Sequence, residues 1–321
     1  MAISRPPRIT LAVLPTPLEA VPRLSAAWGG PPILVKRDDL TGFELSGNKV
    51  RKLEYHLAAA LDAGASTVVT CGAIQSNHCR ATALAAARVG LGCRLLLRTA
   101  DGQAPPEISG NHLLHRLAGA SIRYVTPAEY DDRDRLLAEE AAEIGGAWVI
   151  PEGASDDLGM WGFITAAEEI AAQIDGDVAG IWHASSSAGT TAGLAVGLAM
   201  AGVHAPVMAC SVGDPADELA AHVEELVGRS HRRWGTPLPK RPPIVTDAHV
   251  GGGYGVTTRE DLAVQAEATR LTGLLFDPTY TGKALVGLRR EIRGGRVTGP
   301  VVFWHTGGGF AAFAADWPMP R

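Results

Sequence analysis

One lysine near the start of a predicted helix is the first candidate for chemistry in this sequence. Lys49 lies in the stretch LSGNKVRKLE, and apolar residues recur every three or four positions from Val50 to Leu61, which predicts a helix that Gly64 ends. The first turn of a helix carries unpaired N–H groups and a partial positive charge, which disfavour a further cation. Lys49 therefore either extends into water or points into a cleft, where desolvation lowers its pKa and makes it a nucleophilic amine.

Two loops that follow predicted strands have the composition of anion-binding sites. The first, CGAIQSNHCR, places Ser76, Asn77 and His78 just before a helix, where backbone N–H groups and polar side chains can bind a carboxylate or a ligand oxygen. Ser and Asn are also favoured helix caps, so a capping role is the alternative.

The second loop, ASSSAGTTAGL, has small residues from Ser185 to Thr191 before a helix, which leaves the helix amides open to a phosphate group. It is not a Walker loop, because the only Gly-Lys pair, Gly282-Lys283, is followed by Ala284. No GxGxxG motif is present either. A tight turn that packs the helix without any ligand is the alternative.

A third polar loop and two tyrosines complete the set of candidates. HTGGGF follows the predicted strand 301–304, and Tyr254 and Tyr280 lie in the glycine-rich stretches GGGYG and DPTYTGK. A buried tyrosine is more often a hydrogen-bonded core residue than an acid. Two tyrosines in such loops make a role in proton transfer the competing interpretation.

Short strands and helices that alternate along the chain must position these residues. We predict strands at 33–36, 67–70, 94–97, 122–125, 148–150, 181–183, 207–211, 244–246, 274–276 and 301–304. Besides the Lys49 helix, we predict helices at 80–89, 111–117, 128–144, 190–200, 216–227, 260–271 and 282–293, and an exposed basic loop at 228–243. The alternation indicates an α/β fold with helices on both faces of parallel sheets. Ligands bind such sheets at the carboxyl ends of the strands, where the polar loops lie.

Composition narrows the classes of partner. The 321 residues are 46% hydrophobic, enough for a large core in one or two domains, and the net charge of -5 gives no reason to expect nucleic acid or an anionic membrane. No apolar run approaches 18 residues, and prolines interrupt the N-terminal segment, so we expect a soluble, cytoplasmic protein that binds small molecules. Cys71, Cys79, Cys93 and Cys210 form no CxxC pair, which indicates reduced thiols and no zinc site.

Six motifs, taken together and in order, resemble one enzyme family. GNKVRKLE, GAIQSNH, SSSAGTTAGL, GGGYG, DPTYTGK and HTGG, between Leu34 and Gly308, are similar to those of the D-cysteine desulfhydrase and 1-aminocyclopropane-1-carboxylate deaminase family. These are pyridoxal-phosphate enzymes of fold type II, the tryptophan synthase β type. The resemblance implies a homodimer whose chain has two three-layer domains with parallel sheets and the cofactor between them. The smaller domain would span residues 46–157, and the larger residues 1–45 plus 158–321.

The resemblance also implies roles for particular residues. Lys49 would hold the cofactor as a Schiff base and then act as the base on the substrate carbon. Asn77 would bind the cofactor's ring oxygen, Ser76 and His78 would join it in holding the substrate carboxylate, and Thr306 would face the pyridine nitrogen. The phosphate cup would consist of Ser187, Ala188, Gly189, Thr190 and Thr191. A hydroxyl cannot fully protonate the ring nitrogen, so the site would favour β-elimination, with Tyr254 and Tyr280 polarising the leaving group or steering protons.

Several functions follow from the resemblance, and one is preferred. We expect α,β-elimination from a small β-substituted amino acid, first of all D-cysteine, to give pyruvate, ammonia and hydrogen sulfide. Deamination of 1-aminocyclopropane-1-carboxylate is the rival, but deaminases resemble Tyr-Glu where this chain has Tyr280-Thr281, and Tyr-Thr resembles the desulfhydrase branch. Elimination of sulfite from L-cysteate is a further alternative. A non-catalytic binding protein is disfavoured, because Lys49, Ser76, Tyr254 and Tyr280 are all present.

Four departures from the family pattern concern the substrate more than the cofactor. Ser46 replaces the first glycine of the usual GGNK, Ser186 stands where glycine is common, and Thr257 lacks the usual proline. Gly309-Phe310 replaces an Ala-Pro-like pair, and Phe310 would reshape the pocket near Thr306. A specialised biosynthetic β-elimination on an unusual amino acid is therefore a second prediction.

Overall fold

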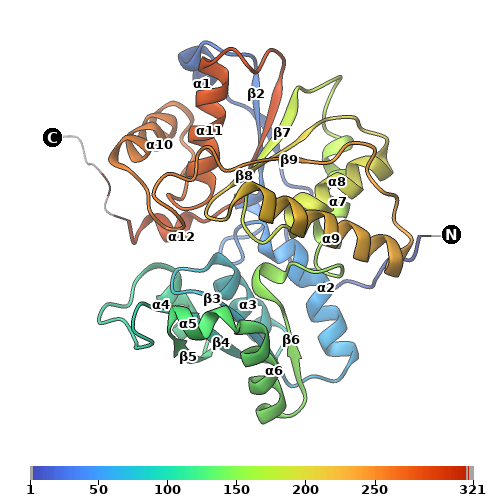
Figure 1. Ribbon diagram of the computed structural model, residues 1–321, viewed down its shortest axis with the longest axis vertical. Helices are drawn as coiled ribbons and strands as arrows, with labels where there is room; N and C mark the ends of the chain where they lie inside the picture. Colours follow the sequence, from blue (N-terminus) through green and yellow to red (C-terminus); the bar gives the residue numbers. More distant parts are fainter. Residues whose placement is uncertain (1–2, 316, 318–321) are drawn as a thin grey trace.

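The computed structural model describes residues 3–315 and residue 317, and its strands form two separate sheets (Figure 1). The larger sheet has the order β1-β2-β10-β7-β8-β9, and the smaller has the order β5-β4-β3-β6. The strands of the larger sheet are β1 (Leu18–Ala20), β2 (Ile33–Arg37), β7 (Gly180–Ser185), β8 (Val207–Ser211), β9 (Ile244–Thr246) and β10 (Val301–His305). Those of the smaller sheet are β3 (Thr67–Ala73), β4 (Gly92–Arg98), β5 (Ser121–Val125) and β6 (Ala147–Val149).

The larger sheet is parallel except for its first edge strand, β1, which pairs antiparallel with β2. Every residue of β7 and β10 is buried, as expected of strands covered on both faces. The helices on one face are α7 (Trp161–Ala171), α8 (Gly189–Ala201) and α9 (Ala216–Trp234), and those on the other are α1 (Pro22–Trp28), α10 (Arg259–Thr272) and α11 (Thr281–Arg293).

The smaller sheet is fully parallel and also lies between two helical layers. Val68 of β3 packs toward α2 (Lys49–Asp62) and α3 (Asn77–Arg88), whereas its neighbour Val69 packs toward α5 (Pro127–Asp131) and α6 (Arg133–Ile144). This alternation is the two-residue period of a strand buried on both faces. The remaining helices are α4 (Gly110–Leu117), α12 (Gly309–Ala312) and two short 3-10 helices at Asp38–Leu40 and Glu152–Ala154.

Helix α7 packs against both α2 and α8, the two helices that begin at the polar loops, because glycines let the three backbones approach closely. A Cβ atom on Gly162 of α7 would lie 2.4 Å from the carbonyl oxygen of Arg51 in α2. Cβ atoms on Gly193 and Gly197 of α8 would lie 2.5 Å from the carbonyl oxygens of Met160 and Ile164. The starts of α2 and α8 are therefore held at a fixed separation.

The fold class predicted from the sequence is confirmed, with three corrections to its elements. Residues 274–276 form no strand, although their apolar character suggested one. The predicted loop at 228–243 is wrong in its first part, because α9 continues to Trp234. Within this extension, Arg229 and Arg233 both bind Asp157 at 2.9 Å. The predicted helix 128–144 is divided at Asp132 into α5 and α6.

The strands of the smaller sheet all lie between residues 67 and 149, and those of the larger sheet lie on both sides of that segment. This arrangement supports two domains, but their boundaries at residues 46 and 157 stay a prediction. All four cysteines are buried and free, as expected of reduced thiols. None of the described helices is long and apolar enough to cross a membrane.

Candidate active site

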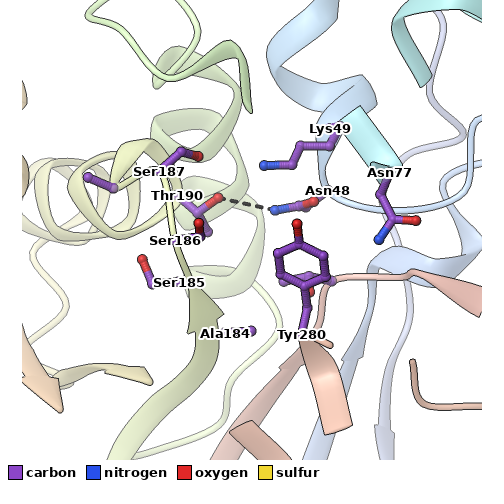
Figure 2. Close-up of a pocket in the computed structure, with 11 residues that line it drawn as sticks. Asn48, Lys49, Asn77, Ala184, Ser185, Ser186, Ser187, Thr190 and Tyr280 are labelled. Carbon is purple, nitrogen blue, oxygen red and sulfur yellow. Dashed lines mark hydrogen bonds between the residues drawn. The ribbon is translucent and has the colours of Figure 1, made fainter. Parts of the chain in front are cut away.

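The polar loops converge on one small cavity at the carboxyl ends of the strands (Figure 2). It lies between the start of α2, the start of α3, the loop between β7 and α8, and the segments that precede α11 and α12. Its lining residues are Asn48, Lys49, Asn77, Ala184, Ser185, Ser186, Ser187, Ala188, Thr190, Tyr280 and Thr306.

Lys49 is the first residue of α2, and its side chain lies in the wall of the cavity (Figure 2). Burial lowers the pKa of its amine to about 8, although the charge of Glu152 partly opposes this. Within the described part of the chain, no acceptor is hydrogen-bonded to its Nζ. Gly153 makes room for it, since a Cβ atom there would lie 3.2 Å from Nζ. The amine is thus accessible from the cavity and much easier to deprotonate than an ordinary lysine.

The start of α8 offers uncovered backbone amides to the same cavity. Ala188 precedes the helix with a φ of 62°, and no side chain caps the helix. The amide of Asn48 donates to Thr190 Oγ1 at 3.2 Å, and Ser187 Oγ lies 2.8 Å from Ser155 Oγ. An uncapped helix start bordered by hydroxyl groups is a favourable site for an anion.

A second lysine, Lys52, lies beside this helix start and was not predicted from the sequence. Its fully buried Nζ donates to Ser155 Oγ at 2.9 Å and to the carbonyl oxygen of Gly153 at 3.3 Å. A Cβ atom on Gly189 would lie 2.9 Å from it. Burial, and then the charge of Lys49, lower the pKa of Lys52 well below its usual value. An anion at the start of α8 would stabilise its charged form. The sequence did contain a signal for Lys52. It stands three residues after Lys49, a spacing that places both lysines on one helix face.

Asn77 is held in one orientation by Asn111, which was also not predicted. Asn111 Nδ2 donates to Asn77 Oδ1 at 2.8 Å and to the carbonyl oxygen of Gln75 at 2.8 Å. The amide nitrogen of Asn77 is therefore directed toward the cavity, where it can donate to a ligand oxygen (Figure 2).

The side chains of Ser76 and His78 do not line the cavity. Ser76 Oγ accepts from the backbone N–H of Cys79 at 3.1 Å, so it caps α3, the alternative left open by the sequence. His78 Nε2 lies 2.8 Å from Thr70 Oγ1. Burial and the nearby charge of Lys49 lower the pKa of His78 well below its usual value, so its ring is neutral.

The two tyrosines are in contact. Their hydroxyl oxygens lie 2.5 Å apart, and Tyr280 lines the cavity while Tyr254 lies behind it. Burial raises the pKa of Tyr254 to about 12 and that of Tyr280 well above its usual value. Both are hydroxyl donors at neutral pH. Asp277 positions Tyr280 by accepting from its backbone N–H at 2.7 Å.

Four other predicted positions differ in whether they line the cavity. Thr306 lines the cavity, and its carbonyl oxygen accepts from the backbone N–H of Asn48 at 3.1 Å. The hydroxyl of Thr281 is bound to Asp277 Oδ1 at 2.6 Å, and that of Thr191 lies 2.8 Å from Ser185 Oγ, so neither lines the cavity. Phe310 lies outside the cavity as well, with its ring 5.7 Å from that of Phe43 and under the guanidinium of Arg80. The expectation that Phe310 reshapes the pocket is not met by this arrangement.

Comparisons with known proteins agree on one family. The pyridoxal-phosphate dependent enzyme family matches residues 9–307. The chain is 41% identical to a D-cysteine desulfhydrase of Yersinia pestis (strain Pestoides F), over 96% of each chain. It is 38% identical to a putative 1-aminocyclopropane-1-carboxylate deaminase of Thermotoga maritima, over 96% of this chain and 98% of that one. The crystal structure of an ACC deaminase homologue superposes with a TM-score of 0.87 at 33% identity, over 96% of this chain and 94% of that chain.

Proposed function

The chain belongs to the pyridoxal-phosphate-dependent enzymes, in the group of D-cysteine desulfhydrases and 1-aminocyclopropane-1-carboxylate deaminases, and we propose that it performs β-elimination on a small amino acid. D-Cysteine is the first candidate substrate, and it would give hydrogen sulfide, pyruvate and ammonia. The homodimer and the cytoplasmic location expected from the sequence stay predictions.

The donor groups around the cavity match those that this cofactor requires. The uncapped start of α8 and the buried amine of Lys52 would bind its phosphate, and the amide nitrogen of Asn77 would donate to its ring oxygen. The hydroxyl of Thr306 would lie near the ring nitrogen, and Lys49 would supply the amine that binds the aldehyde. When bound, pyridoxal phosphate accepts the negative charge that develops at the substrate's α-carbon.

Lys49 is also the base that we propose for the substrate's α-proton. Its amine borders the cavity, and its pKa of about 8 makes a neutral fraction available at physiological pH. Loss of the proton lets the electron pair form a double bond between the α- and β-carbons while the sulfur leaves with the bonding pair. The unsaturated amine that is released reacts with water to give pyruvate and ammonia.

The pair of tyrosines would assist the departure of the leaving group. Tyr280 and Tyr254 share a short hydrogen bond, and both remain protonated at neutral pH because burial raises their pKa values. A tyrosine hydroxyl in this state can donate a hydrogen bond to a departing thiolate, but it cannot serve as a base. The contact between these tyrosines beside the Lys49 amine is the observation that carries the elimination proposal.

The rival activity is deamination of 1-aminocyclopropane-1-carboxylate, since similar proteins carry both names. Its substrate has no α-proton, so the enzyme must open the ring with additional help. Thr281 argues against it, because its hydroxyl is bound to Asp277 and lies outside the cavity. Elimination of sulfite from L-cysteate is a further alternative within the same chemistry.

A substrate panel tests the proposal. The purified protein with bound cofactor is given both enantiomers of cysteine, L-cysteate and 1-aminocyclopropane-1-carboxylate, and the rates of pyruvate and 2-oxobutyrate formation are measured. We expect pyruvate from D-cysteine at the highest kcat/KM. Faster formation of 2-oxobutyrate would reverse the ranking, and the absence of any product would reject the elimination proposal.

A further inference from the structure

A second cavity, of about 750 Å³, adjoins the candidate active site. Ser186 and Ser187 line both cavities, and Tyr254 in the second is bound to Tyr280 in the first. A side chain as small as that of cysteine leaves such a volume empty. The space is therefore available to a larger group attached to the β-carbon of a substrate.

Arg98 provides a cation in the wall of the second cavity. It is the last residue of β4, and its half-buried guanidinium lies 5.0 Å from the ring centre of Tyr130 and 5.8 Å from that of Tyr254. In residues 3–315 and 317, no carboxylate lies within ion-pair distance of Arg98, and its guanidinium donates no hydrogen bond. Two aromatic rings thus hold the side chain in place and leave its donors free.

The other arginines of this cavity have carboxylate partners. Arg133 binds Glu152 at 3.1 Å, and Arg229 binds Asp157 at 2.9 Å. The cavity also has acidic side chains at exposed positions, Asp131, Asp134, Asp214 and Glu218, and two half-buried carboxylates, Glu152, which pairs with Arg133, and Asp156, which lies 3.1 Å from His56 Nε2. Water and salt screen such exposed charges strongly, whereas a half-buried guanidinium interacts more strongly with a ligand.

Tyr254 and Tyr280 lie between Arg98 and the cavity that contains the Lys49 amine. Tyr280 borders the Lys49 cavity, Tyr254 is bonded to it, and Arg98 lies over the ring of Tyr254. A leaving group that receives a hydrogen bond from the tyrosine pair and extends past Tyr254 would reach the guanidinium.

We infer that Arg98 binds an anionic group on the leaving group, so that the preferred substrates are β-substituted alanines whose sulfur carries a chain ending in a carboxylate. This inference rests on the proposed elimination and adds the substrate class. The net reaction is R–S–CH2–CH(NH3+)–COO− plus water to R–SH, pyruvate and NH4+, where R carries the carboxylate. The α-carbon loses a proton, the C–S bond breaks with its electron pair on sulfur, and no oxidant or reductant is required.

A matched pair of substrates tests the inference. S-Carboxymethylcysteine and S-carbamoylmethylcysteine have nearly the same size and differ in charge, and both enantiomers of each are assayed for pyruvate with the cofactor-loaded protein. We expect kcat/KM to favour the carboxylate by about tenfold or more, as a charge-assisted hydrogen bond predicts. In Arg98→Met this ratio should fall to about one, and in Arg98→Lys it should be partly retained.

Arg229→Met is the control, because Arg229 lines the same cavity and Arg233 remains to pair with Asp157. This variant should keep the wild-type ratio. A wild-type ratio near one would overturn the inference, as would an unchanged ratio in Arg98→Met. A loss of cofactor affinity in Arg98→Met, measured by titration with pyridoxal phosphate, together with an unchanged ratio would assign Arg98 to the cofactor and reject its role toward the substrate. If no amino acid gives pyruvate, D-cysteine included, the elimination proposal itself fails.

Discussion

At the scale of single residues, the site depends on an amine that its surroundings keep easy to deprotonate. Lys49 lies at the positive end of α2, and burial lowers its pKa to about 8. Lys52, one turn further along, adds a second buried amine beside it. The two amines are tolerable together because burial and the charge of Lys49 lower the pKa of Lys52 well below its usual value, so Lys52 can stay neutral until an anion occupies the start of α8.

The reactivity of Lys49 should follow its lowered pKa. At pH 7 about 10% of an amine with a pKa of about 8 is neutral, roughly 300 times the fraction for the usual 10.5. In the cofactor-free protein, acylation of Lys49 by acetic anhydride should therefore accelerate about tenfold per pH unit below 8 and level off above it. Mass spectrometry of the labelled peptides measures this rate, with the exposed Lys240 as an internal reference. A rate that still rises at pH 10 would contradict the lowered pKa.

Tyr280 should matter most for leaving groups that depend on a hydrogen bond from its hydroxyl. We expect Tyr280→Phe to reduce kcat for D-cysteine by about 10- to 100-fold, because the variant lacks the hydroxyl that assists the thiolate. For β-chloro-D-alanine, whose chloride leaves without a proton, the loss should be much smaller. Tyr124→Phe, which removes a hydroxyl bound to His112 in a different region, is the control. Equal losses for both substrates would instead indicate a structural role for Tyr280.

The sequence alone could identify the residues that stand in recognisable stretches, and it missed those that act through distant partners. Lys49, Asn77 and the loop before α8 were predicted from spacing and composition, and all of them line one cavity. Asn111 and Arg98 were not found, because each acts through a partner that is distant in the sequence. Asn111 binds Asn77, which lies 34 residues away, and Arg98 contacts Tyr254, which lies 156 residues away. Ser76 illustrates the opposite error, because it was predicted to bind the substrate but caps α3 in the structure. A helix-capping serine and a ligand-binding serine have the same local sequence pattern.

At the scale of elements, α7 is the part that sets the distance between the amine and the anion site. It lies against α2 through Gly162 and against α8 through Gly193 and Gly197. Each contact is so close that a single methyl group would separate the helices. The geometry of the site is thus determined by residues that do not line it.

Gly193→Ala should disturb both stability and cofactor binding. Its new Cβ atom would lie 2.5 Å from the carbonyl oxygen of Met160, so α8 must shift. We expect the free energy of unfolding to fall by about 1–3 kcal/mol and the dissociation constant of pyridoxal phosphate to rise. Thermal denaturation and cofactor titration measure the two effects.

Gly228→Ala is the matched control, because it also replaces a glycine within a helix. Its Cβ atom would meet only the flexible guanidinium of Arg232, at 3.2 Å. This change should leave stability the same or raise it by up to about 1 kcal/mol. Equal behaviour of the two variants would show that the contact between α7 and α8 is looser than the structure indicates.

Two strands were predicted at their observed bounds, whereas one helix was predicted too short, and the reason is physical. The strands at 207–211 and 244–246 were predicted at their observed bounds from short apolar runs between turn residues. The extension of α9 to Trp234 depends on Asp157, which binds Arg229 and Arg233 from another part of the chain. No local pattern contains that information, and the basic, proline-rich composition beyond it favoured a loop.

At the scale of the whole molecule, a buried group of charges joins α2, α7 and the larger sheet. Glu169 of α7 accepts hydrogen bonds from Arg51 of α2 and from Lys36 of β2, and Arg51 also binds Asp38 at 2.7 Å. Burial by itself raises the pKa of Glu169, but Arg51 and Lys36 outweigh this and lower it to about 2.

The stability of the protein should therefore depend on pH through Glu169. A carboxylate with a lowered pKa stabilises the fold fully above its usual value of 4.5, and this contribution disappears as the pH falls toward about 2. Glu169→Gln should lower the melting temperature at pH 7 by roughly 4–8 °C, since about 3 kcal/mol is the upper bound from the shift. The gap from wild type should shrink below pH 4.5. Glu168→Gln, at the exposed pair with Arg5, should change little. A gap that is constant from pH 7 to pH 3 would exclude this role.

The order of strands in the larger sheet has a consequence for synthesis on the ribosome. β2 and β7 are both complete by residue 185, yet they are joined only by β10, which ends at His305. The smaller sheet is finished at residue 149 and can fold while translation continues. The nascent chain must therefore keep the edges of β2 and β7 that face β10 unpaired until residues 301–305 have emerged, and assistance from a chaperone would be most valuable during that interval.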